Sequence, residues 1–369
     1  MTLNYRLGVF GFLGLPSLRA ESTDNASGNY ALMDQQAAMR WIQRNIAKFG
    51  GDPQRVTMAG ESAGASAVCM HLTSPTARGL FMRGVMESGN CFATPLATLE
   101  KSGSNYAAAA GCADAATAAQ CLRSKSALDL IQAAASTAVI TQPVIAGNLL
   151  PQAPFEAIRA GTWNKVPMII GANHDEQRIF LFLGIGGKLP VSDTGYAEQV
   201  HTLFGANAER VLAEYPLKAY PNASIALSTV LDGYVGRSCR SIAMVDEFSK
   251  TASVWHFEFN DQTAPPQFPR PDYFPIAAAH AHELQYFFAF DSTAPLVGPQ
   301  VTLSKQMQAY WTAFAATGDP GSAGGPVWPH WVPAKHETVS LQTGGNTIRT
   351  NASDDHKCAL WTSLGFGLP

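Results

Sequence analysis

Residues 56–67, with the sequence VTMAGESAGASA, decide the fold of this chain. A short apolar run typical of a buried strand leads into Gly-x-Ser-x-Gly, and a run of small residues that favours a helix follows it. A strand, a tight turn and a helix in this order present the Ser62 hydroxyl as a nucleophile at the end of a sheet. Gly60 and Gly64 are expected where strand and helix pack too closely for side chains. The backbone N–H of Ala63 is predicted to face an oxyanion forming beside Ser62.

The rest of the chain alternates strand-like and helical patterns. Apolar runs typical of buried strands occur at 84–89, 166–171, 254–259 and 339–342, and residues 7–15 read as the end of another. Helical patterns cover 31–49, 97–138 with a turn near 111–114, most of 196–250, and 301–317. This alternation predicts an α/β fold with a mainly parallel sheet flanked by helices. No linker interrupts it, so we expect one domain over residues 1–369.

Composition excludes several classes of protein. The net charge is −3 and no basic run occurs, so no nucleic-acid partner is expected. The sequence contains no uninterrupted stretch of about 18 apolar residues, so no membrane span is predicted. The first residues lack the apolar region of a secretory signal. The six cysteines form no Cys-x-x-Cys pair, and no metal or organic cofactor is expected.

A nucleophilic serine needs a base to take its proton and an acid to orient that base. In α/β-hydrolases the acid follows the nucleophile in the chain and the base comes last. Asp175 and Glu176 follow the predicted strand 166–171, and His280 and His282 lie in a later loop. The residues alone do not choose within either pair. A His-x-His metal pair is the alternative for the histidines, but no further ligands are indicated nearby.

Several tracts resemble the type-B carboxylesterase family, which includes cholinesterases and fungal lipases and has the α/β-hydrolase fold. The similarity runs from the first residues to about residue 361, and is carried by NYRLGVFGFL (4–13), GNYALMDQQ (28–36), FGGDP (49–53), GESAG (60–64) and CALW (358–361). It implies a serine esterase that hydrolyses short to medium carboxylic esters through an acyl-enzyme, without a cofactor.

The resemblance assigns roles within the open pairs. It implies a triad of Ser62, Glu176 and His280, although Gln177 and Ala281 replace glycines of the family motifs around the acid and the base. It also implies that four further residues support the site or line the substrate pocket, namely Glu61, Ser88, Ile179 and Phe180. An aliphatic side chain at Ile179 argues against a choline ester, whose cation binds aromatic rings.

The cysteines carry a further implication of the resemblance. Cys112 and Cys121 match a bridged pair of the family, and Cys239 and Cys358 match a second pair. Cys69, within the helix after the nucleophile, is expected to be a buried thiol. Disulfides indicate an exported protein, either periplasmic or extracellular.

The family carries a His-Gly-Gly-Gly loop upstream of its Asn-Tyr-Arg tract, and this loop supplies most of the oxyanion hole. No His-Gly-Gly occurs in this sequence, so the resemblance implies that the family's N-terminal loop and first strands are missing. We therefore expect weak turnover and an open sheet edge that favours a homo-oligomer. The alternatives are a fragment that needs a separate N-terminal piece, and a non-catalytic adhesion or scaffold relative.

Overall fold

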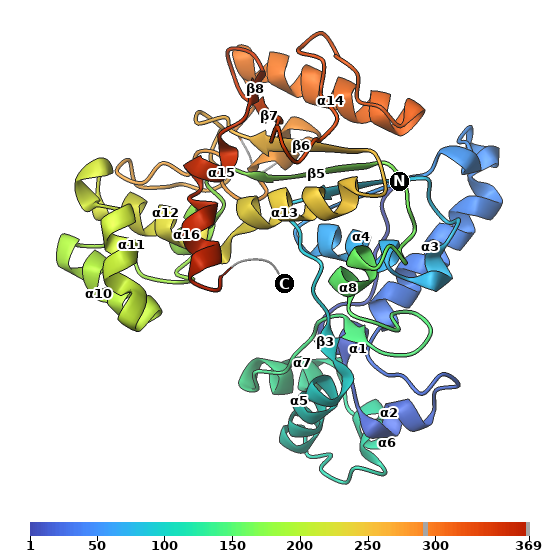
Figure 1. The fold of residues 1–369 in the computed structure, drawn as a ribbon. Coiled ribbons are helices and arrows are strands. Elements are labelled where there is room, and N and C mark those ends of the chain that lie inside the picture. The colour runs from blue at the N-terminus through green and yellow to red at the C-terminus, as the bar shows by residue number, and fades with distance from the viewer. Residues whose placement is uncertain (291–293, 367–369) are drawn as a thin grey trace.

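The computed structural model describes residues 1–290 and 294–366. At its centre lies a six-stranded sheet with the order β1-β2-β5-β6-β7-β8 (Figure 1). Its first five strands are parallel, and β8 pairs antiparallel with β7. The strands are β1 (Thr57–Glu61), β2 (Arg83–Glu87), β5 (Met168–Asn173), β6 (Val254–Phe259), β7 (Thr338–Leu341) and β8 (Thr347–Arg349). The predicted α/β fold with a mainly parallel sheet is confirmed.

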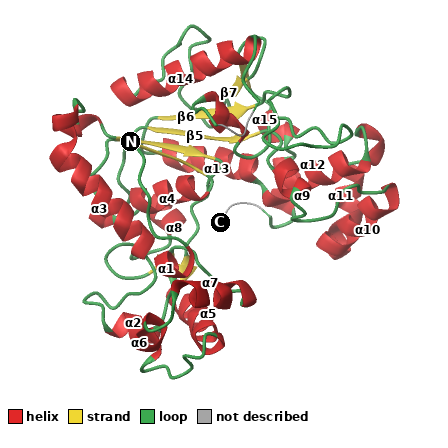
Figure 2. Ribbon diagram, turned by 180° about the vertical axis from the view of Figure 1, so that it is seen from behind, coloured by secondary structure: helices red, strands yellow, loops and turns green. Residues whose placement is uncertain are grey.

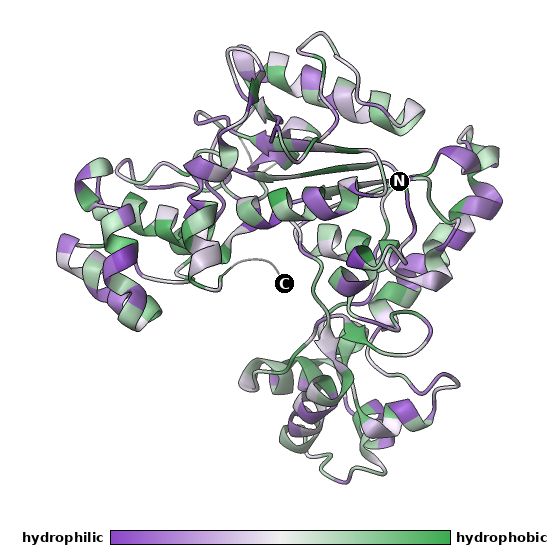
Figure 3. Cartoon of the chain, in the orientation of Figure 1, coloured by the Kyte–Doolittle hydropathy of each residue, from purple (hydrophilic) through white to green (hydrophobic). Residues whose placement is uncertain are grey.

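Helices cover both faces of this sheet. One face carries α14 (Pro299–Thr317), and the other carries α4 (Ala63–Leu72), α8 (Pro154–Arg159) and α13 (Arg237–Ser249) (Figures 1 and 2). Side chains alternate along each strand, so Val85 and Ile169 pack with the residues of α14 while Met86 and Ile170 pack towards α4, α8 and α13. The strands are therefore apolar on both faces. In Figure 3 the strands at the centre of the molecule are largely coloured as hydrophobic.

Two helical lobes extend from this central layer (Figure 1). One has its own apolar core and contains α9 (Gln177–Phe182), α10 (Asp193–Phe204), α11 (Ala208–Glu214), α12 (Ala223–Val235) and α16 (Cys358–Ser363). The other contains α1 (Gly8–Phe12), α2 (Pro16–Ala20), α5 (Leu96–Ala109), α6 (Ala118–Arg123) and α7 (Ala127–Ser136). The two-stranded sheet of β3 (Thr94–Pro95) and β4 (Val144–Ile145) adjoins the second lobe. The remaining helices are α3 (Tyr30–Asn45) and α15 (Ala352–Asp355).

Most predicted elements are found, with one clear error. Residues 7–15 are not the end of a strand but contain α1, in which the amides of Phe10 and Gly11 both donate to the Leu7 carbonyl. A short apolar run does not distinguish a strand from a buried helical turn. The helix at 31–49 is found as α3 and a following 3₁₀ turn, and it ends where Gly50 adopts a left-handed conformation at φ 80°.

The open edge expected for the sheet corresponds to β1. In the described part of the chain, β1 pairs with β2 alone, and its other side has no partner strand. Self-association through this edge stays a prediction. Among the described residues, no helix combines the length and the apolar character needed to cross a bilayer.

Three disulfides join all six cysteines. Cys112–Cys121 and Cys239–Cys358 are paired as the resemblance implied, and the third bond joins Cys69 to Cys91. The expectation of a buried thiol at Cys69 is therefore wrong. Cys69 is buried on α4, but Cys91, in the segment after β2, lies beside it because β1 and β2 are neighbours.

The disulfides should differ in their contribution to stability. Cys239 and Cys358 are 119 residues apart, whereas Cys112 and Cys121 are 9 apart. In the loop-entropy description, removing the longer link costs about 5 kcal/mol and removing the shorter one about 2.5 kcal/mol. We expect the double variant Cys239→Ala, Cys358→Ala to unfold at a clearly lower urea concentration than Cys112→Ala, Cys121→Ala. Equal midpoints with equal slopes would contradict this ranking.

Candidate active site

The turn between β1 and α4 holds Ser62 in a conformation that few non-glycine residues adopt. Ser62 has φ 56° and ψ −114°, and its amide donates to the carbonyl of Glu87 over 2.9 Å. A Cβ at Gly60 would lie 2.3 Å from the backbone of Gly64, so only glycine allows this approach of strand and helix. At Gly64 itself a Cβ would meet no atom within 4 Å, so the expected clash there is not found.

Glu176 and His280 are brought together from two different loops. Glu176 follows β5 and precedes α9, and His280 lies in the long segment after β6. The Oε2 atom of Glu176 is 2.5 Å from Nδ1 of His280. The two loops also pair through their backbones, since the amide of Asp175 donates to the carbonyl of Ala278 over 2.9 Å. The side chain of Asn173 adds a bond to the carbonyl of Ala279 over 2.6 Å.

The neighbouring candidates Asp175 and His282 make other contacts. Asp175 pairs with Arg178 at 2.8 Å and accepts a hydrogen bond from Gln262 over 2.7 Å. The Nδ1 atom of His282 lies 3.3 Å from the backbone oxygen of His280, and burial lowers the pKa of His282 to about 4. Of the two open pairs, Glu176 and His280 are therefore the members that contact each other.

The free nitrogen of His280 does not contact the serine hydroxyl in this structure. Its Nε2 atom lies 3.1 Å from Oε1 of Glu61, the residue before Ser62. No hydrogen bond between the Ser62 hydroxyl and His280 occurs among the described residues. Such bonds are often long before substrate binds and tighten in the complex.

Four carboxyl groups interact in and around the site, two of them in contact with His280, and their surroundings give them different pKa values. Burial raises the pKa of both Glu61 and Glu87 to about 7, and the indole N–H of Trp311 donates to Glu87 over 2.9 Å. Burial, together with the neighbouring charges of Glu87 and Glu61, also raises the pKa of Glu283 well above its usual value. Burial opposes ionisation of Glu176 too, but His280 and Arg237 outweigh it and hold its pKa below the usual value. Only Glu176 is thus kept charged at mildly acidic pH.

Sequence reasoning missed Arg237, which links several parts of the site. Its Nη1 donates to the carbonyl of Ser88 over 2.6 Å, and its Nε is 3.8 Å from Glu176. Its guanidinium also lies 5.6 Å from the ring centre of Phe180. Arg237 begins α13 directly after Gly236, and no local pattern distinguishes it from a surface arginine. Its position follows only from the packing of α13 on β5.

Ser62 opens into a cavity of about 300 Å³ that Arg237 and Phe92 also line. Phe180 lies close by, because its ring centre is 5.1 Å from that of His280. Ser88 is buried at φ 57° directly after β2. Ile179 is packed in the apolar core of the α9–α12 lobe and is not among the residues that line this cavity.

Comparison with known proteins gives consistent matches. A family model described as "Carboxylesterase family" matches residues 1–361. The chain is 32% identical over 356 residues to acylcarnitine hydrolase of Mus musculus, covering 89% of this chain and 60% of that protein. It is 31% identical over 353 residues to fumonisin B1 esterase of Sphingopyxis macrogoltabida, covering 90% and 61%. Identity to para-nitrobenzyl esterase of Bacillus subtilis (strain 168) is 31% over 384 residues, covering 99% and 73%. The chain thus spans about 60% of the length of the first two relatives.

The raised pKa of Glu87 predicts a pH-dependent loss of stability. Between pH 4.5 and about 7, the folded protein keeps a proton on Glu87 that the unfolded chain has released. The free energy of unfolding therefore falls with rising pH across this window because of Glu87, by about 1.4 kcal/mol per pH unit. Glu87→Gln keeps an acceptor for Trp311 and removes this titration. We expect the unfolding free energy of Glu87→Gln, measured in urea, to rise relative to that of the wild type by about 1.4 kcal/mol for each pH unit in this window.

Glu198→Gln, at an exposed carboxylate on α10, is the matched control and should follow the wild-type pH profile. Glu176 does not contribute in this window because its folded pKa lies below 4.5. If the difference in unfolding free energy between Glu87→Gln and wild type stayed constant from pH 4.5 to about 7, the raised pKa of Glu87 would be contradicted.

Proposed function

Because the chain belongs to the carboxylesterase family, we propose that it is a serine ester hydrolase in which Ser62 is the nucleophile, His280 the base and Glu176 the acid. The single observation that carries the proposal is the 2.5 Å contact between Glu176 Oε2 and His280 Nδ1. The other nitrogen of this imidazole contacts Glu61, the residue before the strained turn at Ser62. A buried carboxylate on Nδ1 fixes the tautomer whose Nε2 accepts a proton. Strain at a non-glycine residue supports the same site, since such outliers concentrate where function requires them.

The reaction follows from these groups. Ser62 Oγ attacks the ester carbonyl carbon as its proton passes to His280 Nε2, and Glu176 stabilises the imidazolium. The carbonyl oxygen becomes an oxyanion towards the Ala63 N–H at the start of α4. The C–O bond to the alcohol then breaks, and the alcohol leaves with the proton from His280. Water attacks the acyl-Ser62 ester by the same route in reverse and releases the acid.

Glu61 has a supporting role in this proposal. It contacts His280 Nε2 at 3.1 Å, so the imidazole must exchange this contact for one with Ser62 before proton transfer. With a pKa raised to about 7 by burial, Glu61 adds little negative charge below neutrality and does not compete strongly with Glu176 for the imidazolium. Ser88 and Phe180 border the same region, and we propose Phe180 as a wall beside the base. The pocket role of Ile179 stays a prediction.

The substrates we propose are short to medium carboxylic esters. Beside Ser62 the cavity of about 300 Å³ is lined by apolar side chains such as Phe12, Leu32 and Phe92 together with polar ones such as Gln35 and Asn90. The relatives are named for hydrolysis of acylcarnitine, fumonisin B1 and para-nitrobenzyl esters. We also propose that the protein is exported, because three disulfides are typical of an oxidising compartment.

Ser62→Ala should abolish hydrolysis of a short-chain p-nitrophenyl ester, lowering kcat by about four to six orders of magnitude. His280→Ala should lower kcat nearly as much, because triad residues act as a unit. His282→Ala is the matched control: it removes a buried imidazole two residues away that does not contact Glu176, and it should retain most activity. Initial rates at saturating ester give the comparison.

A fluorophosphonate probe separates this proposal from a non-catalytic relative. Intact-mass and peptide analysis should find one adduct on wild-type protein, at Ser62, and none on Ser62→Ala. A larger loss of kcat in His282→Ala than in His280→Ala would mean that the base is misassigned. Wild-type protein that neither turns over the ester nor reacts with the probe would contradict the esterase proposal.

A further inference from the structure

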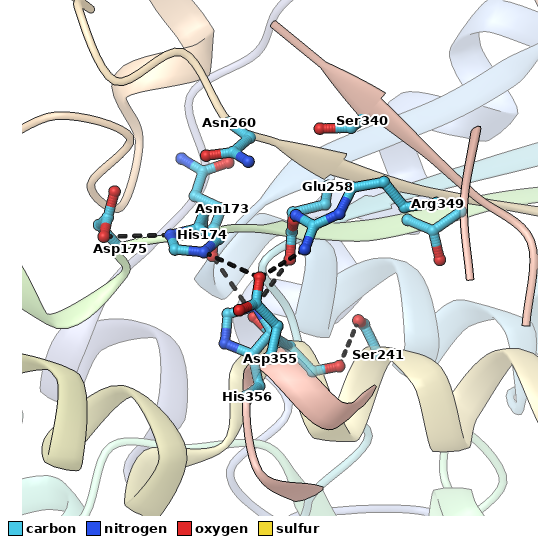
Figure 4. Close-up of polar contacts among 12 residues, drawn as sticks. Asn173, His174, Asp175, Ser241, Glu258, Asn260, Ser340, Arg349, Asp355 and His356 are labelled. Carbon is cyan, nitrogen blue, oxygen red and sulfur yellow. Dashed lines mark hydrogen bonds and ion pairs between the residues drawn. The ribbon is translucent and has the colours of Figure 1, made fainter. Parts of the chain in front are cut away.

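A second polar cluster lies on the other side of the loop that holds Glu176. Figure 4 shows its side chains converging from separate parts of the chain. His174 follows β5, Glu258 lies on β6, and His356 follows α15. One ligand atom from each of these three residues lies within 4.8 Å of the other two. We call these residues the His174–Glu258–His356 cluster.

Two imidazoles and one carboxylate are a ligand set that zinc uses with water or a fourth side chain. The cluster differs from an exposed acidic patch because two of its members are buried, with side-chain exposures of 3% for Glu258 and 6% for His356. In a tetrahedral zinc site the ligand atoms are about 3.3 Å apart. The widest separation would therefore contract by about 1.5 Å at most, and the 2.6 Å between His356 Nε2 and Glu258 Oε1 would widen by about 0.7 Å.

The contacts around the cluster orient its ligand atoms. Nδ1 of His174 lies 3.1 Å from Oδ1 of Asp175, which leaves Nε2 directed to the cluster. Oε2 of Glu258 accepts from Arg349 over 2.7 Å, and Oε1 faces Nε2 of His356 over 2.6 Å, so Oε1 points into the cluster. A carboxylate behind a ligating histidine, and a donor behind a ligating carboxylate, are the outer partners that metal ligands usually have.

A further carboxylate lies next to the cluster. Arg349 is paired with both Glu258 and Asp355, so a single guanidinium faces two carboxylates. Asp355 also lies 3.4 Å from Nε2 of His174. An ion bound by the cluster would therefore meet a fourth oxygen ligand at Asp355 or a water molecule.

A pocket gives an ion access to these residues. A cavity of about 430 Å³ is lined by His174, Asp355 and His356, with Tyr220 and Tyr273 among its other walls. The side chain of His174 is 27% exposed and that of Asp355 is 39% exposed. The cluster is thus half open on the pocket side and closed on the side of the sheet. An entry path is one of the features that a metal site requires.

We propose that His174, Glu258 and His356 bind a zinc ion, with the fourth position directed to Asp355 and the pocket. Zinc takes the place of the hydrogen bond between His356 Nε2 and Glu258 Oε1, which are 2.6 Å apart, and the imidazole then binds the ion through Nε2 with its N–H on Nδ1. The ion would join the ends of β5 and β6 to the segment that carries Cys358. Its role is structural, and the proposal does not rest on ester hydrolysis.

The test is a zinc titration of protein first treated with EDTA and then freed of it, in competition with a chromophoric chelator. We expect wild-type protein to bind one equivalent of zinc. His174→Ala and His356→Gln should each weaken binding by about 100-fold or more, because losing even an outer partner of a metal ligand weakens affinity 10- to 100-fold. His201→Ala is the matched control, since the exposed imidazole of His201 pairs with Glu209 at 3.2 Å on the surface, and this variant should bind like wild type.

His174 is partly exposed, so His174→Ala decides the question even where the buried His356→Gln fails to fold. Zinc should also raise the melting temperature of wild type and His201→Ala but not of His174→Ala. Cobalt(II) should give the visible absorption of a four-coordinate site in wild type and His201→Ala but not in His174→Ala. Absence of stoichiometric zinc binding, or equal binding by wild type and His174→Ala, would overturn the proposal.

Discussion

The structure depends on the close approach of α4 to β1. Gly60 has no side chain, and a Cβ there would overlap the backbone of Gly64, so the helix can begin directly above the end of the strand. The price of this approach is the left-handed conformation of Ser62, at φ 56°. Ser88 and Ala281, which flank the same region, also have positive φ values. Three of the non-glycine residues with positive φ thus lie around the candidate site, two of them directly after the parallel strands β1 and β2.

Around this turn, carboxyl groups differ in pKa because their surroundings differ. Glu61, Glu87 and Glu283 lie where burial raises their pKa values, whereas His280 and Arg237 keep Glu176 ionised. Carboxyl groups whose pKa values are pushed apart in this way take different roles in one site.

The loop after β5 connects the two polar clusters of the molecule. Residues 173–176, from the last residue of β5 onward, make contacts on both sides of this loop. Asn173 and Glu176 hold the His280 loop, and His174 and Asp175 contact the cluster formed with Glu258 and His356. The Cys239–Cys358 bond lies beside this second cluster and fixes α16 against α13. The segment that carries His356 and Cys358 is thus linked by these contacts to the loop that carries Glu176.

The sequence by itself determined the features that depend on neighbours in the chain. Period and turn residues identified the strands of the parallel sheet, the stop of α3 at Gly50 and the nucleophile turn at Ser62, because each follows from local backbone preferences. Residues 7–15 were assigned wrongly, because a short apolar run fits a strand and a helical turn equally well.

Only the tertiary structure decided which distant residues meet. Residues 175 and 176, or 280 and 282, are equivalent as patterns, and the resemblance to a family, not the local pattern, chose between them. In the structure, Glu176 and His280 contact each other although they are 104 residues apart in the chain, and Asp175 and His282 make other contacts. The same holds for Arg237 beside Ser88, for Cys69 beside Cys91, and for His174 beside His356. Each pairing is set by how strands are ordered in the sheet and how helices pack on it, and no local spacing encodes that order.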